Sequence, residues 1–138
     1  MRTALSALAL AAAACAAATE TEPKTAPSAG KRAYQKCYSC HALEPGRNNL
    51  GGPTLHAVIG RKIASEPFDY SPALRAFAVA NPVWTRDLLD RFAADPEQLV
   101  PGTTMLFHGI ADPAERGALL NYLELASDQT KASERSLP

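Results

Sequence analysis

Apolar residues recur along the chain with the three- and four-residue spacing of helices, and they do not alternate in the way that strands require. Two segments with this spacing cover residues 31–38 and 84–92, and a third lies near the C-terminus. In the second segment, Leu88 and Leu89 precede Phe92 by four and three residues and therefore share its face. The pattern predicts an all-α protein with three main helices.

The last expected helix begins with recognisable signals. Asp112 can cap the helix, Pro113 suits its first position, and Glu115 lies three residues after the cap. The apolar residues that it carries, up to about Ala126, are Leu119, Leu120, Tyr122 and Leu123. Residues 128–138 are polar, and we expect them to form a frayed tail.

Turn-forming residues interrupt the rest of the chain at Pro45-Gly46, Gly51-Gly52-Pro53, Pro67, Pro72, Pro82, Pro96 and Pro101-Gly102. So much loop leaves a domain of about 100 residues with a thin core of its own. We therefore expect a buried group in the middle of the domain.

The N-terminus has the features of an export signal. Arg2 supplies a positive charge, residues 3–14 are apolar, and residues 16–18 are small, as a cleavage site requires. We expect residues 1–18 to be removed as a signal peptide. Alternatively, a lipoprotein signal ends before Cys15, and a lipid on its sulfur anchors the protein to a membrane. Both alternatives place the protein in the periplasm or another exported compartment.

Composition limits the remaining possibilities. The segment 19–29 consists mainly of Thr, Glu, Pro, Ala and Ser, so we expect a flexible spacer there. Residues 30–127 then form one domain, as a length of 138 residues allows. The 14 basic and 14 acidic residues balance, which argues against nucleic acid as a partner. Three cysteines are too few for a disulfide-stapled fold.

Cys37, Cys40 and His41 form the sequence C-x-x-C-H, which is the attachment motif of c-type haem. Two thiols three positions apart can each add to a haem vinyl group and form a thioether bond. The histidine that follows can bind the iron through Nε2. The motif therefore predicts one haem c, held covalently through Cys37 and Cys40.

Other readings of the two cysteines fit the chain less well. A thioredoxin-like redox pair needs a βαβ fold, and the chain has no strand pattern. A zinc site needs more ligands, and only His56 and His108 remain to supply them. A disulfide between Cys37 and Cys40 would leave His41 without a purpose. A colourless redox-thiol protein nevertheless stays as one alternative.

The iron needs a second axial ligand, and Met105 is the first candidate. Once Met1 is removed with the signal, Met105 is the only methionine that remains in the sequence. A thioether ligand paired with His raises the reduction potential. Met105 lies in a turn-rich segment where packing against a helix face is not expected. His56 and His108 are rival ligands, although we expect both at the surface.

At these residues the chain resembles the class I monohaem cytochromes c, which include the mitochondrial type and its soluble bacterial relatives. The resemblance spans about residues 29–126. Its motifs occur in the family's order, as Cys37 to His41, Gly52-Pro53, Leu55-His56, Gly60-Arg61-Lys62, Tyr70-Ser71 and Pro101-Gly102-Thr103 with Met105. It implies the class I cytochrome c fold, with three main helices plus short helices and loops around one covalent haem.

The resemblance also implies roles for single residues. The Pro53 carbonyl would accept a hydrogen bond from His41, which fixes the ring and increases its donor strength. The residues that would hold the inner haem propionate are Arg61, Tyr70 and Trp84. Thr103 and Met105 would belong to the loop of the distal ligand, with Phe107 beside the exposed haem edge.

Three further expectations follow from the family. Gly30 and Tyr34 would meet Leu119 and Tyr122 where the first and last helices cross, because glycine permits a close approach. Phe92 stands where the family commonly has a tyrosine bonded to the methionine sulfur. Thr104 replaces the lysine of mitochondrial proteins, so a positive charge at the haem edge is missing.

The function implied is one-electron transfer in an exported respiratory or photosynthetic chain, by a monomeric carrier that is not an enzyme. The implied partners are a quinol–cytochrome c oxidoreductase and a haem-copper oxidase. The alternative is a peroxidase-like or gas-binding haem protein with a displaceable sixth ligand. Residues 28–80 carry a net charge of +4 and residues 81–127 one of −4. This split indicates either a dipole that orients the protein toward a partner or simply solvated faces.

Overall fold

The computed structural model describes residues 28–136, and within them the chain forms five helices. They are α1 (Ala29–Tyr34), α2 (Pro72–Ala80), α3 (Arg86–Ala94), α4 (Pro96–Leu99) and α5 (Pro113–Arg135). The described part contains no strand and only one isolated bridge, between Lys62 and Val83. The all-α prediction is therefore confirmed. The expected signal, residues 1–18 with Cys15, lies outside the described residues.

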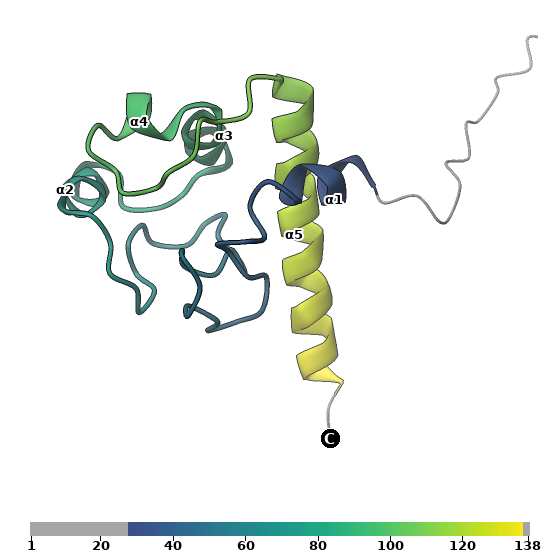
Figure 1. Cartoon of the computed structure of the whole chain (residues 1–138). Helices are drawn as coiled ribbons and strands as arrows, with labels where there is room; N and C mark the ends of the chain where they lie inside the picture. Colours follow the sequence, from purple (N-terminus) through teal and green to yellow (C-terminus); the bar gives the residue numbers. More distant parts are fainter. Residues whose placement is uncertain (1–27, 137–138) are drawn as a thin grey trace, which may run out of the picture.

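α1 and α5 cross closely at one side of the molecule (Figure 1). A Cβ atom on Gly30 would collide with the Ala118 carbonyl oxygen and would lie 2.5 Å from Cβ of Tyr122. The rings of Tyr34 and Tyr122 lie 5.8 Å apart at the same crossing. The expected meeting of the first and last helices is confirmed, and its geometry explains why Gly30 has no side chain.

The first helix is shorter than the expected 31–38. α1 ends at Tyr34, and turns continue to Cys40. After Tyr34, backbone bonds to partners three residues back, as in Cys37 N to Tyr34 O at 2.8 Å, are mixed with bonds to partners four residues back, as in His41 N to Cys37 O at 2.9 Å. This irregular, partly tighter winding ends the α-helix. The C-x-x-C-H motif therefore lies in turns and not in a helix.

Pro72 and Pro96 begin helices, although the sequence presents them only as interruptions. Each occupies the first turn of its helix, where a missing N–H costs nothing. The side chains of Ser71 and Asp95 cap these helices by accepting a backbone N–H three residues on, at 3.1 and 2.9 Å. α4 is short, with 4 residues, but α2 has 9 residues, as many as α3 and more than the 6 of α1, so the apolar spacing missed a full-length helix here.

α5 runs to Arg135, so the expected frayed tail is wrong for the residues up to that point. Ser127 is buried on this helix and explains part of the difference. Its Oγ donates to the Leu123 carbonyl and accepts the Ala57 N–H, both at 2.8 Å. The helix is thus fastened to a loop far away in the sequence.

The core lies between α5 and α3. Leu88, Leu89 and Phe92 on α3 are buried, as the spacing predicts, and Phe92 packs against Trp84 with ring centroids 5.0 Å apart. α3 begins at Arg86 and not at Trp84, because Thr85 caps it. Within the described range, no helix is both long enough and apolar enough to cross a membrane.

Candidate functional site

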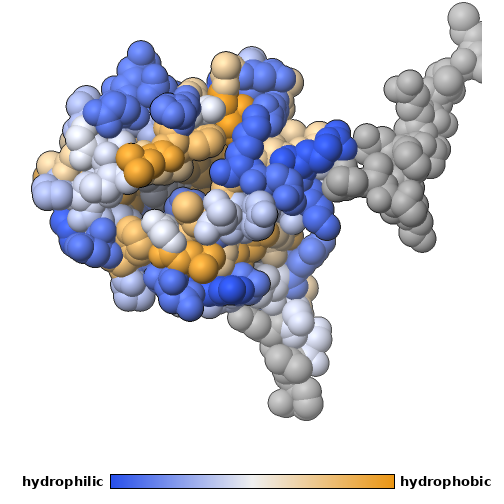
Figure 2. Space-filling view, viewed as in Figure 1, coloured by the Kyte–Doolittle hydropathy of each residue, from blue (hydrophilic) through white to orange (hydrophobic). Residues whose placement is uncertain are grey.

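A cleft of about 360 Å³ opens on one face of the molecule, with apolar residues around it (Figure 2). Its walls come from the turns after α1, the loops between α1 and α3, the loop between α4 and α5, and the helices α2, α3 and α5. The structure brings together here all the site residues predicted from the sequence, namely Cys37, Cys40, His41, Pro53, Arg61, Tyr70, Trp84, Thr103 and Met105.

The two thiols lie at one wall of the cleft in different surroundings. Cys37 is buried and Cys40 is exposed, and neither forms a disulfide. Burial raises the pKa of the Cys37 thiol to about 11. The His41 N–H donates to the Cys37 carbonyl at 2.9 Å, which holds the motif in one compact turn. Both sulfurs and the imidazole therefore face the same space.

His41 is oriented by the loop opposite it. Its Nδ1 lies 2.7 Å from the Pro53 carbonyl oxygen, which can only accept, so Nδ1 carries the proton and Nε2 keeps its lone pair. Burial lowers the pKa of the ring and favours this neutral form. A Cβ atom on Gly52 would lie 2.7 Å from both ring nitrogens. Gly52 thus allows the backbone to touch the imidazole.

Met105 lies on the loop between α4 and α5, half-buried against the core. Its N–H donates to Oγ1 of Thr103 at 3.3 Å. The loop is fixed at its two ends by Val100 and Ile110, which are 2% and 1% exposed. Leu106, directly after the methionine, is fully exposed. The thioether of Met105 thus lines the cleft, while the apolar side chain of the next residue is exposed on the surface.

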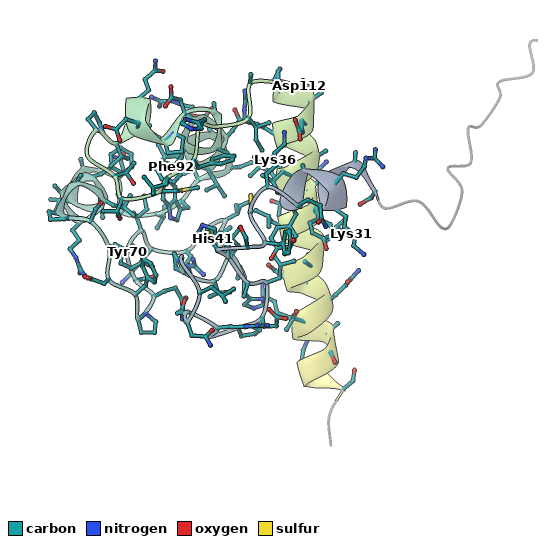
Figure 3. The ribbon with its side chains drawn as sticks, in the orientation of Figure 1. Lys31, Lys36, His41, Tyr70, Phe92 and Asp112 are labelled. Carbon is teal, nitrogen blue, oxygen red and sulfur yellow. The ribbon has the colours of Figure 1, made fainter. Side chains whose placement is uncertain are left out.

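Phe92 lies in the wall of the cleft near this loop (Figure 3). It is 8% exposed and has no hydroxyl that could reach the sulfur of Met105. The departure from the family's tyrosine therefore falls inside the site.

Arg61 is held more tightly than the sequence indicates. Its guanidinium donates to the carbonyl oxygens of His56 and Thr54, each at 2.8 Å, and pairs with Glu66 at 3.2 Å. Burial lowers the pKa of Arg61, while Glu66 acts in the opposite direction. Glu66 is not predictable from the sequence as a partner of Arg61, because an isolated acidic residue in a loop has no pattern that indicates its contacts.

Tyr70 completes this end of the cleft. Its Oη accepts the backbone N–H of Glu66 at 3.3 Å, so its own O–H is left to donate elsewhere. Burial raises the pKa of Tyr70 and keeps the hydroxyl protonated. Arg61 and Tyr70 together offer donors to an acidic group in the cleft.

The rival histidines do not line the cleft. His108 is exposed, as expected. His56 is half-buried and not at the surface, and its buried Nδ1 has no partner among the described residues. No group of three or more His, Cys, Asp or Glu side chains in the described range could hold a metal ion by itself.

A second groove, of about 550 Å³, lies between the loop 57–59 and α5. None of the predicted site residues lines it, and its wall contains no sulfur or imidazole group. The cleft is therefore the candidate site. Its apolar wall, paired thiols, imidazole with a free Nε2 and separate thioether fit a covalently attached haem.

Known proteins similar to this chain were found among both sequences and structures, although no protein-family model matches it. It is 36% identical over 107 residues to cytochrome c-550 of Ancylobacter novellus, covering 76% of this chain and 100% of that protein. It is 40% identical over 98 residues to cytochrome c type-1 of Ascaris suum, covering 70% and 84%.

Two further similarities extend the comparison. Cytochrome c2 of Agrobacterium tumefaciens (strain II Chrys) is 34% identical over 104 residues, which cover 75% of this chain and 94% of that protein. The solved structure of cytochrome cH from Methylobacterium extorquens matches with a TM-score of 0.62 and 35% identity, covering 70% of this chain and 95% of that one. The matches therefore span most of each relative.

Proposed function

The chain belongs to the class I cytochrome c family, and is thus an electron carrier with one covalently attached haem c and not an enzyme; we propose that His41 and Met105 ligate its iron. The observation that carries this proposal is the geometry of His41. Its Nδ1 lies 2.7 Å from the Pro53 carbonyl, so Nε2 is free to bind a metal. Met105 lines the same cleft from a separate loop.

Each residue has a defined task in this proposal. Cys37 and Cys40 fix the porphyrin through thioether bonds, and Pro53 and Gly52 hold the imidazole in one orientation. Trp84, Phe92 and their apolar neighbours exclude water. Arg61, Tyr70 and Trp84 would hold the inner haem propionate by hydrogen bonds, and Thr103 would belong to the loop that carries Met105. Haem iron supplies the one-electron chemistry by alternating between its ferrous and ferric states.

The setting of the reaction is also proposed. An exported compartment fits the signal-like residues 1–18, with Cys15 either removed or lipidated. There, a monomeric carrier would pass electrons between a quinol–cytochrome c oxidoreductase and a haem-copper oxidase, or similar redox proteins of a respiratory or photosynthetic chain. These partners are inferred from family resemblance.

The ligand assignment is tested with Met105→Leu, made in a host that matures c-type haem. We expect this variant to keep its covalent haem but to lose the long-wavelength ferric absorption band that reports sulfur–iron bonding. Its reduction potential should fall, because a soft thioether favours ferrous iron. Val79→Ala is the control, because this exposed side chain on α2 does not line the cleft and its loss should leave both readouts unchanged.

Two results would contradict the proposal. An unchanged absorption band in Met105→Leu would exclude Met105 as the ligand. Colourless wild-type protein, or pigment that dissolves in acidified organic solvent, would exclude attachment through Cys37 and Cys40.

A further inference from the structure

Glu66 brings a negative charge to the end of the cleft where Arg61 and Tyr70 lie. One carboxylate oxygen is 3.2 Å from Nη1 of Arg61, and the other accepts a hydrogen bond from Asn48 at 3.0 Å. Asn48 in turn accepts the Thr54 N–H at 2.9 Å. The carboxylate is therefore held in one position by two neighbours that are themselves fixed.

The Arg61–Glu66 ion pair is less exposed to solvent than the neighbouring pair of Arg75 and Asp69. The side chains of Arg61 and Glu66 are 16% and 20% exposed, whereas those of Arg75 and Asp69, three residues further along from Glu66, are 55% and 106% exposed. Salt and water screen an exposed pair strongly and a sheltered one much less. The charge of Glu66 therefore acts over a longer range than that of Asp69.

Arg61 does not need Glu66 to stay in place. Its Nη1 and Nη2 already donate to the carbonyl oxygens of His56 and Thr54, which belong to the backbone. Contacts with described residues leave its Nε–H and one Nη2–H for a further acceptor. Glu66 thus changes the charge near the cleft more than it changes the position of the guanidinium.

We propose that Glu66 lowers the reduction potential of the haem by neutralising part of the positive charge that Arg61 directs at the cleft. The inference rests on the proposed haem site. Ferric haem carries one more positive charge than ferrous haem, so a nearby carboxylate stabilises the ferric form. Arg61 alone would favour the ferrous form, and Glu66 offsets that preference.

The proposal is tested by measuring reduction potentials of the haem-loaded protein. Glu66→Gln keeps the size of the side chain and removes its charge. At a fixed solution potential we expect its ferrous-to-ferric ratio to rise about two- to tenfold, where tenfold corresponds to about 59 mV for one electron. Asp69→Asn is the matched control, since it removes an exposed acid and should change the ratio little.

Glu66→Asp separates charge from structure. It keeps the carboxylate, so we expect a potential near that of the wild type. The proposal is overturned if Glu66→Gln has the wild-type potential, or if Glu66→Asp shifts the potential as far as Glu66→Gln. Glu66→Ala replaces Glu66→Gln if the latter fails to accumulate with haem, with the same expected direction.

The absorption spectrum distinguishes this inference from the proposed function. Covalent haem with an intact sulfur–iron band and an unshifted potential in Glu66→Gln would overturn the inference alone. Wild-type protein without that haem or that band would overturn the proposed function instead.

Discussion

The imidazole of His41 is positioned almost entirely by backbone groups. Pro53 supplies the carbonyl that accepts the Nδ1–H, and Gly52 lets the chain touch the ring. The hydroxyl of Tyr34 donates to the carbonyl of His41 itself at 2.6 Å. Backbone groups move less than side chains, so this arrangement suits a ligand that must stay in place while the charge of its metal changes.

The Phe92 position tests how the opposite ligand is tuned. Phe92→Tyr would add a hydroxyl in the wall of the cleft near Met105. A hydrogen bond to the sulfur withdraws electron density from it, so we expect the reduction potential to rise. At a fixed solution potential, the ferrous-to-ferric ratio should increase about two- to tenfold.

The measurement for Phe92→Tyr is potentiometry together with the ferric absorption band. Phe77→Tyr is the matched control, because Phe77 contacts Trp84 at 6.4 Å between ring centroids but does not line the cleft. A potential equal to the wild type, with the band intact, would show that the added hydroxyl does not reach the sulfur.

At the residue scale, the sequence was informative where chemistry depends on a motif. Sulfur and imidazole groups at C-x-x-C-H spacing predicted one wall of the cleft, and family order brought Arg61, Tyr70 and Trp84 to it. Glu66 and Asn48 were missed because their roles arise from a loop that brings residues 18 positions apart into contact. Such pairing has no periodic signature in a single sequence.

At the scale of helices, the crossing of α1 and α5 depends on Gly30. Gly30→Leu would force a side chain into the space held by Ala118 and Tyr122, so we expect the free energy of unfolding to fall by about 1–3 kcal/mol or more. Chemical denaturation of the haem-loaded protein measures this.

Gly117 provides the matched control for Gly30. It also lies in a helix, α5, but a Cβ atom there meets nothing within 4 Å. Gly117→Ala should therefore stabilise the protein by roughly 0.5–1 kcal/mol, because alanine loses less conformational entropy. Equal effects of the two substitutions would contradict the close crossing.

Helix positions were predictable from apolar spacing, and helix ends were less so. The Asp112 cap is confirmed, with its side chain accepting the Ala114 N–H at 2.9 Å. The end of α1 depends on a change to tighter turns, and the length of α5 depends on a contact between Ser127 and Ala57. Both are set by tertiary structure, which local periodicity does not record.

At the scale of the whole molecule, charge is distributed unevenly around the cleft. Its lining includes Lys36, Arg61 and Lys62 and no acidic residue from the described range. Lys36 is partly neutralised by Glu115, 2.7 Å away, and Arg61 by Glu66, 3.2 Å away. Lys62 is exposed. The mouth of the cleft should therefore be mildly positive although the chain as a whole is neutral.

This positive mouth predicts a preference among small redox reagents. An anionic reductant should react faster than a cationic one of similar driving force at low salt, by up to about tenfold. The difference should shrink toward 0.15 M salt, where charges are screened beyond about 8 Å. Stopped-flow absorbance measures both rates.

Two variants connect the preference to the cleft. Lys62→Gln should reduce the ratio of the two rates, whereas Lys131→Gln, near the end of α5 and away from the cleft, should not. Equal rates for both reagents at low salt would contradict a positive mouth. They would instead favour the alternative that the oppositely charged halves of the sequence are simply solvated faces.

The buried ends of the Met105 loop have a consequence for how such a sequence can diverge. Val100 and Ile110 are fixed in the core, while Leu106 between them is fully exposed beside the cleft. Substitutions at the two anchors would be selected against for folding, as would a side chain at Gly109, where a Cβ atom would collide with the Ala94 carbonyl oxygen, but exposed positions such as Thr104 and Leu106 are free to change as long as the sulfur keeps its place. A lineage could thus change which proteins it recognises by drift within one short segment, without rebuilding the domain that carries it.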